Sequence, residues 1–244
     1  RVKPDGALEP AGAGNRCVML ERGYIEFLSP HGPGPIGKQL LTGLERYVGI
    51  HLVAFGTSEP FADHARLVQT GFSPLEPVAL ERDIETESTS ETARFNVIRV
   101  PHGTMPEGRI QFCHHLTPHW LWQNRWTQHP NYATAVSGII FCVPDPQEAV
   151  ERYARFTGLS PIAQKNCMSI TTARGSLLFF ERLTLGSRLG FSEQCDFLPP
   201  TLPWIAGYVL KTPNLQGTYD CLEKKANQPR ILENERLLVE MRHC

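Results

Sequence analysis

Apolar residues along the chain follow two patterns in a fixed order, and this order occurs twice. A short apolar run at residues 51–55 precedes an amphipathic segment at 60–69, and a second run at 138–143 precedes another at 148–156. Short apolar runs are typical of buried strands, whereas apolar residues three and four positions apart are typical of a helix with one buried face. The repetition predicts that a strand-helix unit is used more than once in the fold.

The ends of the helical segments carry matching signals. Each segment is followed by Gly-x-Ser-Pro, at residues 71–74 and again at 158–161. In the second copy, Asp145 and Pro146 precede the helical spacing. Asp is a favoured N-cap residue, and Pro is favoured at the first helical position. We therefore predict that the second helix begins at Pro146.

Further strands are predicted between the two helices. Residues 93–100 and 109–113 alternate or run apolar, contain β-branched and aromatic side chains, and are bounded by Pro and Gly. The acidic, Ser- and Thr-rich residues 81–91 are predicted to form a solvated loop between strands. The repeated unit is then β-α-β-β-β, and the predicted fold class is α+β with mixed sheets.

A third copy and an incomplete one flank these two. The third copy consists of a strand, a helix and two further strands, at residues 204–210, 215–225, 230–232 and 237–241. Near the beginning, a strand at 24–28 closes a unit whose first strand and helix are missing. We expect a fragment that is cut at both ends, with a first half at residues 1–131 and a second half at 132–244.

Composition and charge narrow the classes of partner. The chain has 244 residues, of which 41% are hydrophobic, and a formal net charge of -1. A charge so close to zero gives no electrostatic reason to expect a nucleic acid or a membrane surface as partner. No apolar run reaches the ~18–20 residues that span a bilayer. The seven cysteines include no Cys-x-x-Cys pair, so we expect reduced, structural thiols and a cytoplasmic protein.

The order of the repeats and two sequence blocks carry a resemblance to a known family. The blocks lie at residues 15–30 and 112–131, and a Glu in the last strand of one unit is followed by a His that opens the next. In these respects the chain resembles the vicinal oxygen chelate superfamily, which includes glyoxalase I, extradiol dioxygenases and bleomycin-resistance proteins. The resemblance is greatest to its glyoxalase-like members. It implies two cup-shaped sheets with flanking helices, and a divalent metal ion on the concave side.

The resemblance also implies three metal ligands. Glu26 matches the family's carboxylate ligand, His51 matches the imidazole that opens the second unit, and Gln111 matches a second carboxylate. A neutral imidazole and a carboxylate on neighbouring strands bind an ion such as Zn, Ni, Mn or Fe and leave positions open for a substrate. Gln111 departs from the pattern, because an amide is a neutral and weak ligand. A solvent-facing Glu26 and a His51 at the rim of the sheet are the structural alternative.

Histidine and tryptophan are concentrated in one window, residues 102–129. Alternation along its strand predicts that His115 shares a face with Gln111. We predict His115 as a catalytic residue, and Arg99 and Trp126 as substrate-binding residues. A cationic group beside aromatic rings suits an oxygen-rich or aromatic molecule. Aromatic packing between the two halves is the structural alternative.

These observations support more than one function. The leading hypothesis is a metal-assisted enzyme of isomerase or lyase type that acts on a small oxygenated substrate, with an extradiol-type dioxygenase as a variant. The rival hypothesis, which Gln111 favours, is a metal-free protein of the bleomycin-resistance type that sequesters a small molecule. A scaffold protein that forms a homodimer through exposed strand edges is a third hypothesis. Residues 32–39 match most of a phosphate-binding loop, but Pro33 and Pro35 remove two N–H groups, so nucleotide binding is not expected.

Overall fold

A computed structural model describes most of the chain, namely residues 12–32, 34–189, 199–224, 230–232 and 236–238. The chain separates into two compact units, each of which contains separate stretches of sequence. Unit 1 consists of Arg1–Gly49, Asn124–Val136 and Leu210–Cys244, and unit 2 of Ile50–Gln123 and Ser137–Val209. The expected division between residues 131 and 132 refers to the repeats and stays a prediction. No helix in the described stretches is both long and apolar enough to cross a membrane.

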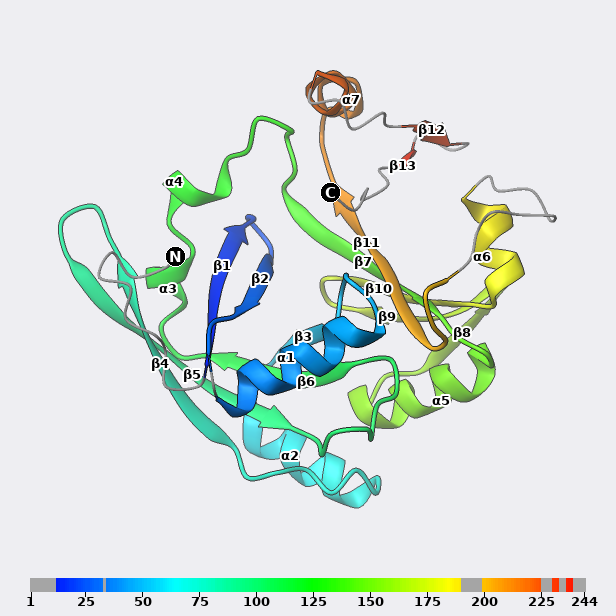
Figure 1. Cartoon of the computed structure of the whole chain (residues 1–244), viewed down its shortest axis with the longest axis horizontal. Coiled ribbons are helices and arrows are strands. Elements are labelled where there is room, and N and C mark those ends of the chain that lie inside the picture. Colours follow the sequence, from blue (N-terminus) through cyan, green and yellow to red (C-terminus); the bar gives the residue numbers. More distant parts are fainter. Residues whose placement is uncertain (1–11, 33, 190–198, 225–229, 233–235, 239–244) are drawn as a thin grey trace. The chain divides into compact units, whose positions relative to one another are not determined.

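The first repeat in unit 2 forms a four-stranded mixed sheet with one helix. Along the sequence its elements are β3 (Leu52–Gly56), α2 (Pro60–Gln69), β4 (Val78–Glu85), β5 (Ser90–Arg99) and β6 (Arg109–His115). In space the strand order is β3-β6-β5-β4, with β3 parallel to β6 and the other pairs antiparallel (Figure 1). The strand-helix-three-strand order predicted from the sequence is confirmed here.

The second repeat has the same topology. Its elements are β7 (Ala135–Cys142), α5 (Pro146–Thr157), β8 (Pro161–Gln164), β9 (Cys167–Thr172) and β10 (Gly175–Phe180). The strand order is β7-β10-β9-β8, with β7 parallel to β10, and β11 (Trp204–Lys211) adds a fifth strand beyond β7. Helix α6 (Arg182–Arg188) follows β10. The repeat and the mixed α+β class are therefore confirmed.

Helix α5 begins where the sequence signals predicted. The side chain of Asp145 accepts hydrogen bonds from the backbone N–H groups of Gln147 at 2.9 Å and Glu148 at 3.1 Å. At the other end, Gly158 has a φ of 74°, a left-handed conformation that glycine adopts without a clash of Cβ. Local sequence thus fixes both ends of this helix.

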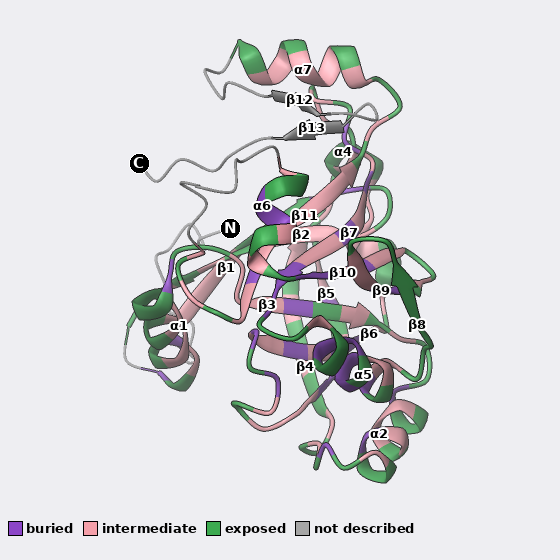
Figure 2. Ribbon diagram, turned by 90° about the vertical axis from the view of Figure 1, so that its right-hand side faces the viewer, coloured by how far each residue is buried: buried purple, intermediate pink, exposed green. Residues whose placement is uncertain are grey.

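Aromatic side chains from both repeats form the core of unit 2. Phe156 of α5 is fully buried, and its ring centroid is 5.1 Å from that of Phe112 in a stacked pair and 5.3 Å from that of Phe72. Figure 2 shows buried residues on α5, whereas β8 is exposed along its length. Arg66 of α2 also donates a hydrogen bond from Nη2 to the carbonyl of Phe156 at 3.2 Å. The two repeats therefore share one core.

A buried ion pair ties the loop before β6 to helix α5. The carboxylate of Glu107 accepts hydrogen bonds from both terminal nitrogens of Arg152, at 2.7 and 2.9 Å. Arg152 also donates from Nε to Glu148 at 2.8 Å. Glu107 is fully buried, where an unpaired charge would be costly. The pair therefore adds a polar connection between the two repeats to the apolar contacts of their shared core.

The described residues of unit 1 form a hairpin, three helices and a short strand pair. Strand β1 (Ala13–Met19) is antiparallel to β2 (Tyr24–Pro30), and helix α1 (Pro35–Arg46) contacts β2. The other elements are α4 (Asn124–Thr127), α7 (Leu215–Glu223), β12 (Arg230–Leu232) and β13 (Arg236–Leu238). The strand predicted at 24–28 and the order of the third copy are confirmed. The strand predicted at 237–241 coincides with β13 up to Leu238, and the remainder lies outside the described residues.

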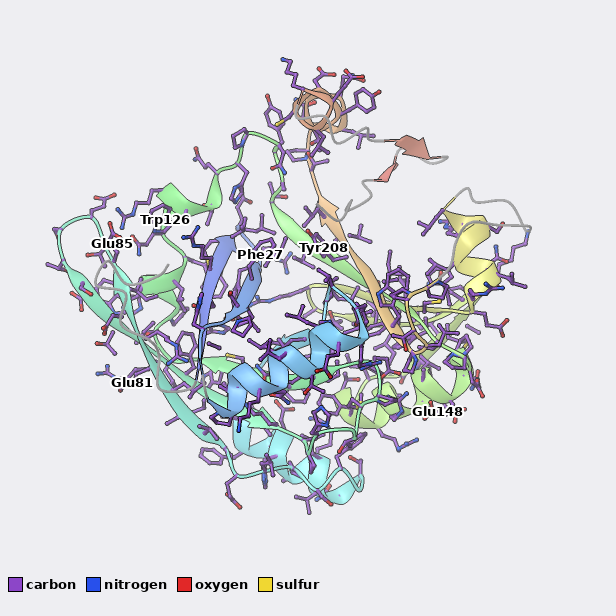
Figure 3. All side chains as sticks on the ribbon, viewed as in Figure 1. Phe27, Glu81, Glu85, Trp126, Glu148 and Tyr208 are labelled. Atoms are coloured by element: carbon purple, nitrogen blue, oxygen red, sulfur yellow. The ribbon has the colours of Figure 1, made fainter. Side chains whose placement is uncertain are left out.

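The loop predicted at residues 81–91 is wrong, because β4 and β5 extend through most of it. Glu81 and Glu85 are exposed on one side of β4 (Figure 3), whereas Arg82 between them is half-buried. Glu81 forms an ion pair with Arg94 of β5 at 2.9 Å. Acidic residues on the exposed side of a strand resemble a loop in composition, so only the period of two identifies the strand.

Candidate functional site

The two faces of the four-stranded sheet differ in chemistry. One face packs against α2, where Ile110 of β6 and Leu67 of α2 belong to the core. Successive strand residues point to opposite sides of a sheet. Alternate positions of β6 therefore lie on the other face: Arg109, Gln111, Cys113 and His115. We call this side the Gln111 face.

Neighbouring strands bring further residues to the Gln111 face. In the antiparallel register of β5 and β6, Arg99 lies opposite Gln111. In the parallel register of β3 and β6, Ala54 lies beside Gln111 and Gly56 lies beside Cys113. Ala54 and Gly56 are both exposed, so no large side chain of β3 flanks Gln111. The predicted site residues Arg99 and Gln111 are thus direct neighbours.

Gln111 offers hydrogen-bond donors rather than an acceptor. Its Oε1 atom accepts a hydrogen bond from Nε of Arg109 at 3.0 Å. Its amide nitrogen makes no hydrogen bond with any described residue. An amide oxygen that is already bonded to a guanidinium, with a second arginine opposite, is a poor ligand for a cation. The surroundings of Gln111 therefore do not fit a divalent metal ion at this position.

Arg99 carries a positive charge that has no partner in the described part of the chain. Its Nε atom is buried and makes no hydrogen bond, and its guanidinium forms no ion pair with a described residue. Burial lowers the pKa of Arg99, the charge of Arg82 lowers it further, and Cys113 opposes the shift. A buried donor without an acceptor costs about 1–3 kcal/mol. The fold therefore holds this guanidinium where its charge is disfavoured.

A second arginine reaches the Gln111 face from the other sheet of unit 2. Arg174 lies in the turn between β9 and β10, and its guanidinium carbon is 3.8 Å from where a Cβ atom of Gly56 would lie. Its side chain also makes no hydrogen bond or ion pair with a described residue. Two unpaired guanidinium groups thus belong to the same region of the sheet.

Aromatic rings enclose His115 at the end of β6. The centroid of its ring is 5.4 Å from that of Phe95 and 5.1 Å from that of Trp122, and both pairs meet edge to face. Trp122 directly follows the short helix α3 (Pro118–Leu121). The Nε2 atom of His115 is 3.9 Å from Sγ of Cys113. As predicted, His115 shares the strand face of Gln111.

The imidazole of His115 is neutral near pH 7. Burial is the largest cause, followed by electrostatic interactions with Arg174 and with His114, and together they lower the pKa of His115 to about 4. Because the charged form is disfavoured on this face, a bound molecule would meet His115 as a neutral polar group.

The free energy of unfolding is expected to fall as the pH drops from about 6.5 to about 4, because the unfolded chain then binds a proton that folded His115 does not. After allowance for solvent screening, the loss is on the order of 1–2 kcal/mol. Urea titrations at several pH values measure the slope of the free energy of unfolding against pH. This slope should be smaller in His115→Gln. His119→Gln, at an exposed position of α3, is the control and should keep the slope. An unchanged slope in His115→Gln would contradict the lowered pKa.

The other two predicted metal ligands, Glu26 and His51, do not belong to the strands of this sheet. Glu26 lies on β2 in unit 1, where its carboxylate accepts a hydrogen bond from Asn15. His51 directly precedes β3, and its carbonyl accepts a hydrogen bond from the backbone N–H of Arg109 at 2.8 Å. Within the described residues, no group of three or more His, Cys, Asp or Glu side chains could hold a metal ion. The ligand roles of Glu26, His51 and Gln111 stay predictions.

Trp126 lies on α4 in unit 1, and its side chain is exposed (Figure 3). The guanidinium carbon of Arg125 is 4.6 Å from the centroid of its ring. Its role in substrate binding stays a prediction.

The sequence analysis did not predict Arg109 or Arg174 as site residues. Arg109 lies two positions before Gln111 on the same strand, so strand alternation predicts that both share one face. The approach of Arg174 to the sheet depends on packing between the repeats, which a single sequence does not show.

Comparison with known proteins is consistent with this fold. The glyoxalase-like domain family matches residues 1–157 of the chain. A solved structure described as a hypothetical protein from Staphylococcus aureus is similar, with a TM-score of 0.58 over 73% of this chain and 79% of that chain, at 11% sequence identity. At that identity the likeness concerns the fold alone. No curated protein matches the chain.

Proposed function

Because this chain belongs to the family of glyoxalase-like domains, we propose that it binds a small oxygen-bearing molecule on the Gln111 face of its four-stranded sheet. The observation that carries the proposal is the unpaired guanidinium of Arg99 opposite the unused amide donors of Gln111. Most buried donors in proteins have an acceptor. Carboxylate, carbonyl and hydroxyl oxygens of a bound molecule would supply one.

Rings beside these donors suit the carbon skeleton of such a molecule. Phe95 and Trp122 flank His115, and Cys113 lies between His115 and Gln111 on the same strand. Small-molecule sites typically combine apolar and aromatic walls with a few polar groups that fix orientation. In this arrangement Arg99 and Gln111 would orient the oxygen atoms, and the rings would contact the remainder of the molecule.

Nuclear magnetic resonance titration of the full chain with catechol, benzyl alcohol and benzoate tests the proposal. We expect at least one of these probes to shift the signals of His115, the Trp122 indole and the Gln111 side-chain amide. Gln111→Leu should weaken the binding of that probe on the order of tenfold, because the hydrogen bond from the Gln111 amide to the probe is lost. Gln69→Leu, at an exposed position of α2, is the matched control. If no probe moves these signals, the proposal is wrong.

A metal-assisted isomerase or lyase is the second candidate, and Glu26 favours it. Its carboxylate is half-buried and accepts a hydrogen bond from Asn15, and carboxylates are common ligands of divalent metal ions. When bound, such an ion would polarise substrate oxygens. Elemental analysis of the protein purified without chelators separates the two candidates. We expect no stoichiometric metal, whereas Zn, Ni, Mn or Fe that is present in the parent and lost in His51→Ala would favour the enzyme.

A further inference from the structure

We propose that the molecule bound on the Gln111 face is a small organic carboxylate whose negative charge lies between Arg99 and Arg174. This inference rests on the proposed function and narrows it to one class of ligand. Neither guanidinium has a hydrogen-bond or ion-pair partner among the described residues. A carboxylate has both the charge and the planar pair of oxygens that match the donor geometry of a guanidinium.

The positive charge on this face is not balanced by carboxylates of the same strands. Arg82 of β4 lies on the Gln111 face in the strand register, and its charge acts on Arg99. The acidic residues of β4 alternate to the opposite face: Glu81, Asp83 and Glu85. Glu91 does share the face of Arg99, but it lies near the other end of β5. In the described strands of this sheet, these carboxylates therefore do not lie beside Arg99.

The backbone around Arg99 favours a carboxylate over a phosphate. Phosphate sites commonly use free backbone N–H groups of a glycine-rich loop or a helix N-terminus. Arg99 and Gln111 instead lie in paired strands, where backbone N–H groups form hydrogen bonds with the neighbouring strands. The donors available here are side-chain groups of Arg99, Gln111 and Arg174, which suit the two oxygens of a carboxylate.

Apolar residues beside the donors indicate that the carboxylate belongs to an organic molecule. Val97 and Cys113 are opposite each other on this face and are both buried. They separate the pair of Arg99 and Gln111 from the pair of Phe95 and His115. The rings of Phe95 and Trp122 offer contacts to the carbon skeleton of an aromatic acid, which an inorganic anion does not have.

Benzoate, benzamide and inorganic phosphate are the probes that test the ligand class on the full chain. We expect benzoate to shift the Trp122 and His115 signals, and the neutral benzamide to bind at least about tenfold more weakly. Phosphate at the same concentration should not shift them. Equal affinity for benzamide, or tighter binding of phosphate, would overturn the carboxylate assignment while small-molecule binding stands. If benzoate, benzamide, catechol and benzyl alcohol all fail to bind, the proposed function fails with it.

Arg99→Met separates a binding role from a structural one. The affinity for benzoate should fall on the order of 10- to 100-fold. The Tm should stay unchanged or rise, because an unpaired, half-buried charge is replaced by an apolar chain of similar length. Arg94→Met is the matched control, because Arg94 lies on the same strand but on the opposite face, paired with Glu81. It should keep the affinity for benzoate.

Arg174→Met is a second test of the proposal, at a position that is not part of the hydrophobic core. Its side chain is exposed, so the fold should be retained, and the affinity for benzoate should fall several-fold. Unchanged affinity in both Arg99→Met and Arg174→Met would show that neither guanidinium holds the carboxylate, and the proposal would be abandoned.

Discussion

Replacing Glu107 by alanine is expected to lower the free energy of unfolding by about 3–5 kcal/mol, because it leaves the buried guanidinium of Arg152 without its main partner. Glu107 is fully buried and accepts two hydrogen bonds from Arg152, at 2.7 and 2.9 Å. The small alanine side chain also leaves a cavity beside Tyr153, whose hydroxyl lies 3.5 Å from Glu107. Denaturation with guanidinium chloride would measure the loss.

Glu148→Ala is the matched control for this change. Glu148 contacts the same guanidinium, but its side chain is 56% exposed, so water replaces the lost interaction. We expect a loss below about 1 kcal/mol. An equal loss in the two variants would mean that burial does not set the energy of the Glu107–Arg152 pair.

Phe156→Ala is expected to cost about 3–5 kcal/mol of unfolding free energy, as is typical when a fully buried aromatic side chain is removed. The ring stacks on Phe112 with an interplanar angle of 10° and meets Phe72 edge to face at 88°. Both partners belong to the other repeat, Phe112 to its sheet and Phe72 to the loop after α2, and cannot collapse into the space without moving that repeat. Thermal and denaturant unfolding would both report the change.

Phe61→Ala provides the comparison for an exposed ring. Phe61 lies on α2 and is 76% exposed, so its removal should change the free energy of unfolding by less than about 0.5 kcal/mol. A large loss there, or a small one in Phe156→Ala, would contradict the description of a single core shared by both repeats.

Strand periodicity was sufficient to predict part of the candidate site. Gln111 and His115 lie on one face because side chains alternate along any strand, whatever packs against it. The place of Arg99 beside Gln111 needs the register of β5 on β6 as well, and that register is set by pairing rather than by local composition. The repeat was recognisable for a similar reason, since each copy carries its own strand, helix and turn signals.

Contacts between the repeats could not be predicted in this way. Glu107 and Arg152 look like ordinary surface residues in the sequence, and only the packing of α5 on the first repeat buries them together. The approach of Arg174 to Gly56 likewise joins two sheets. A single sequence holds no periodic signal for such pairs, because they depend on how two finished units fit against each other.

The shared aromatic core also has a consequence for the order in which the chain is made. Arg66 and Phe156 are in contact although 90 positions separate them, and contacts of such long range are formed slowly. On the ribosome, the first repeat emerges while α5 is still to be synthesised. Phe72 and Phe112 then face water instead of Phe156. Exposed rings of this kind favour aggregation of the nascent chain, and this exposure lasts until α5 emerges.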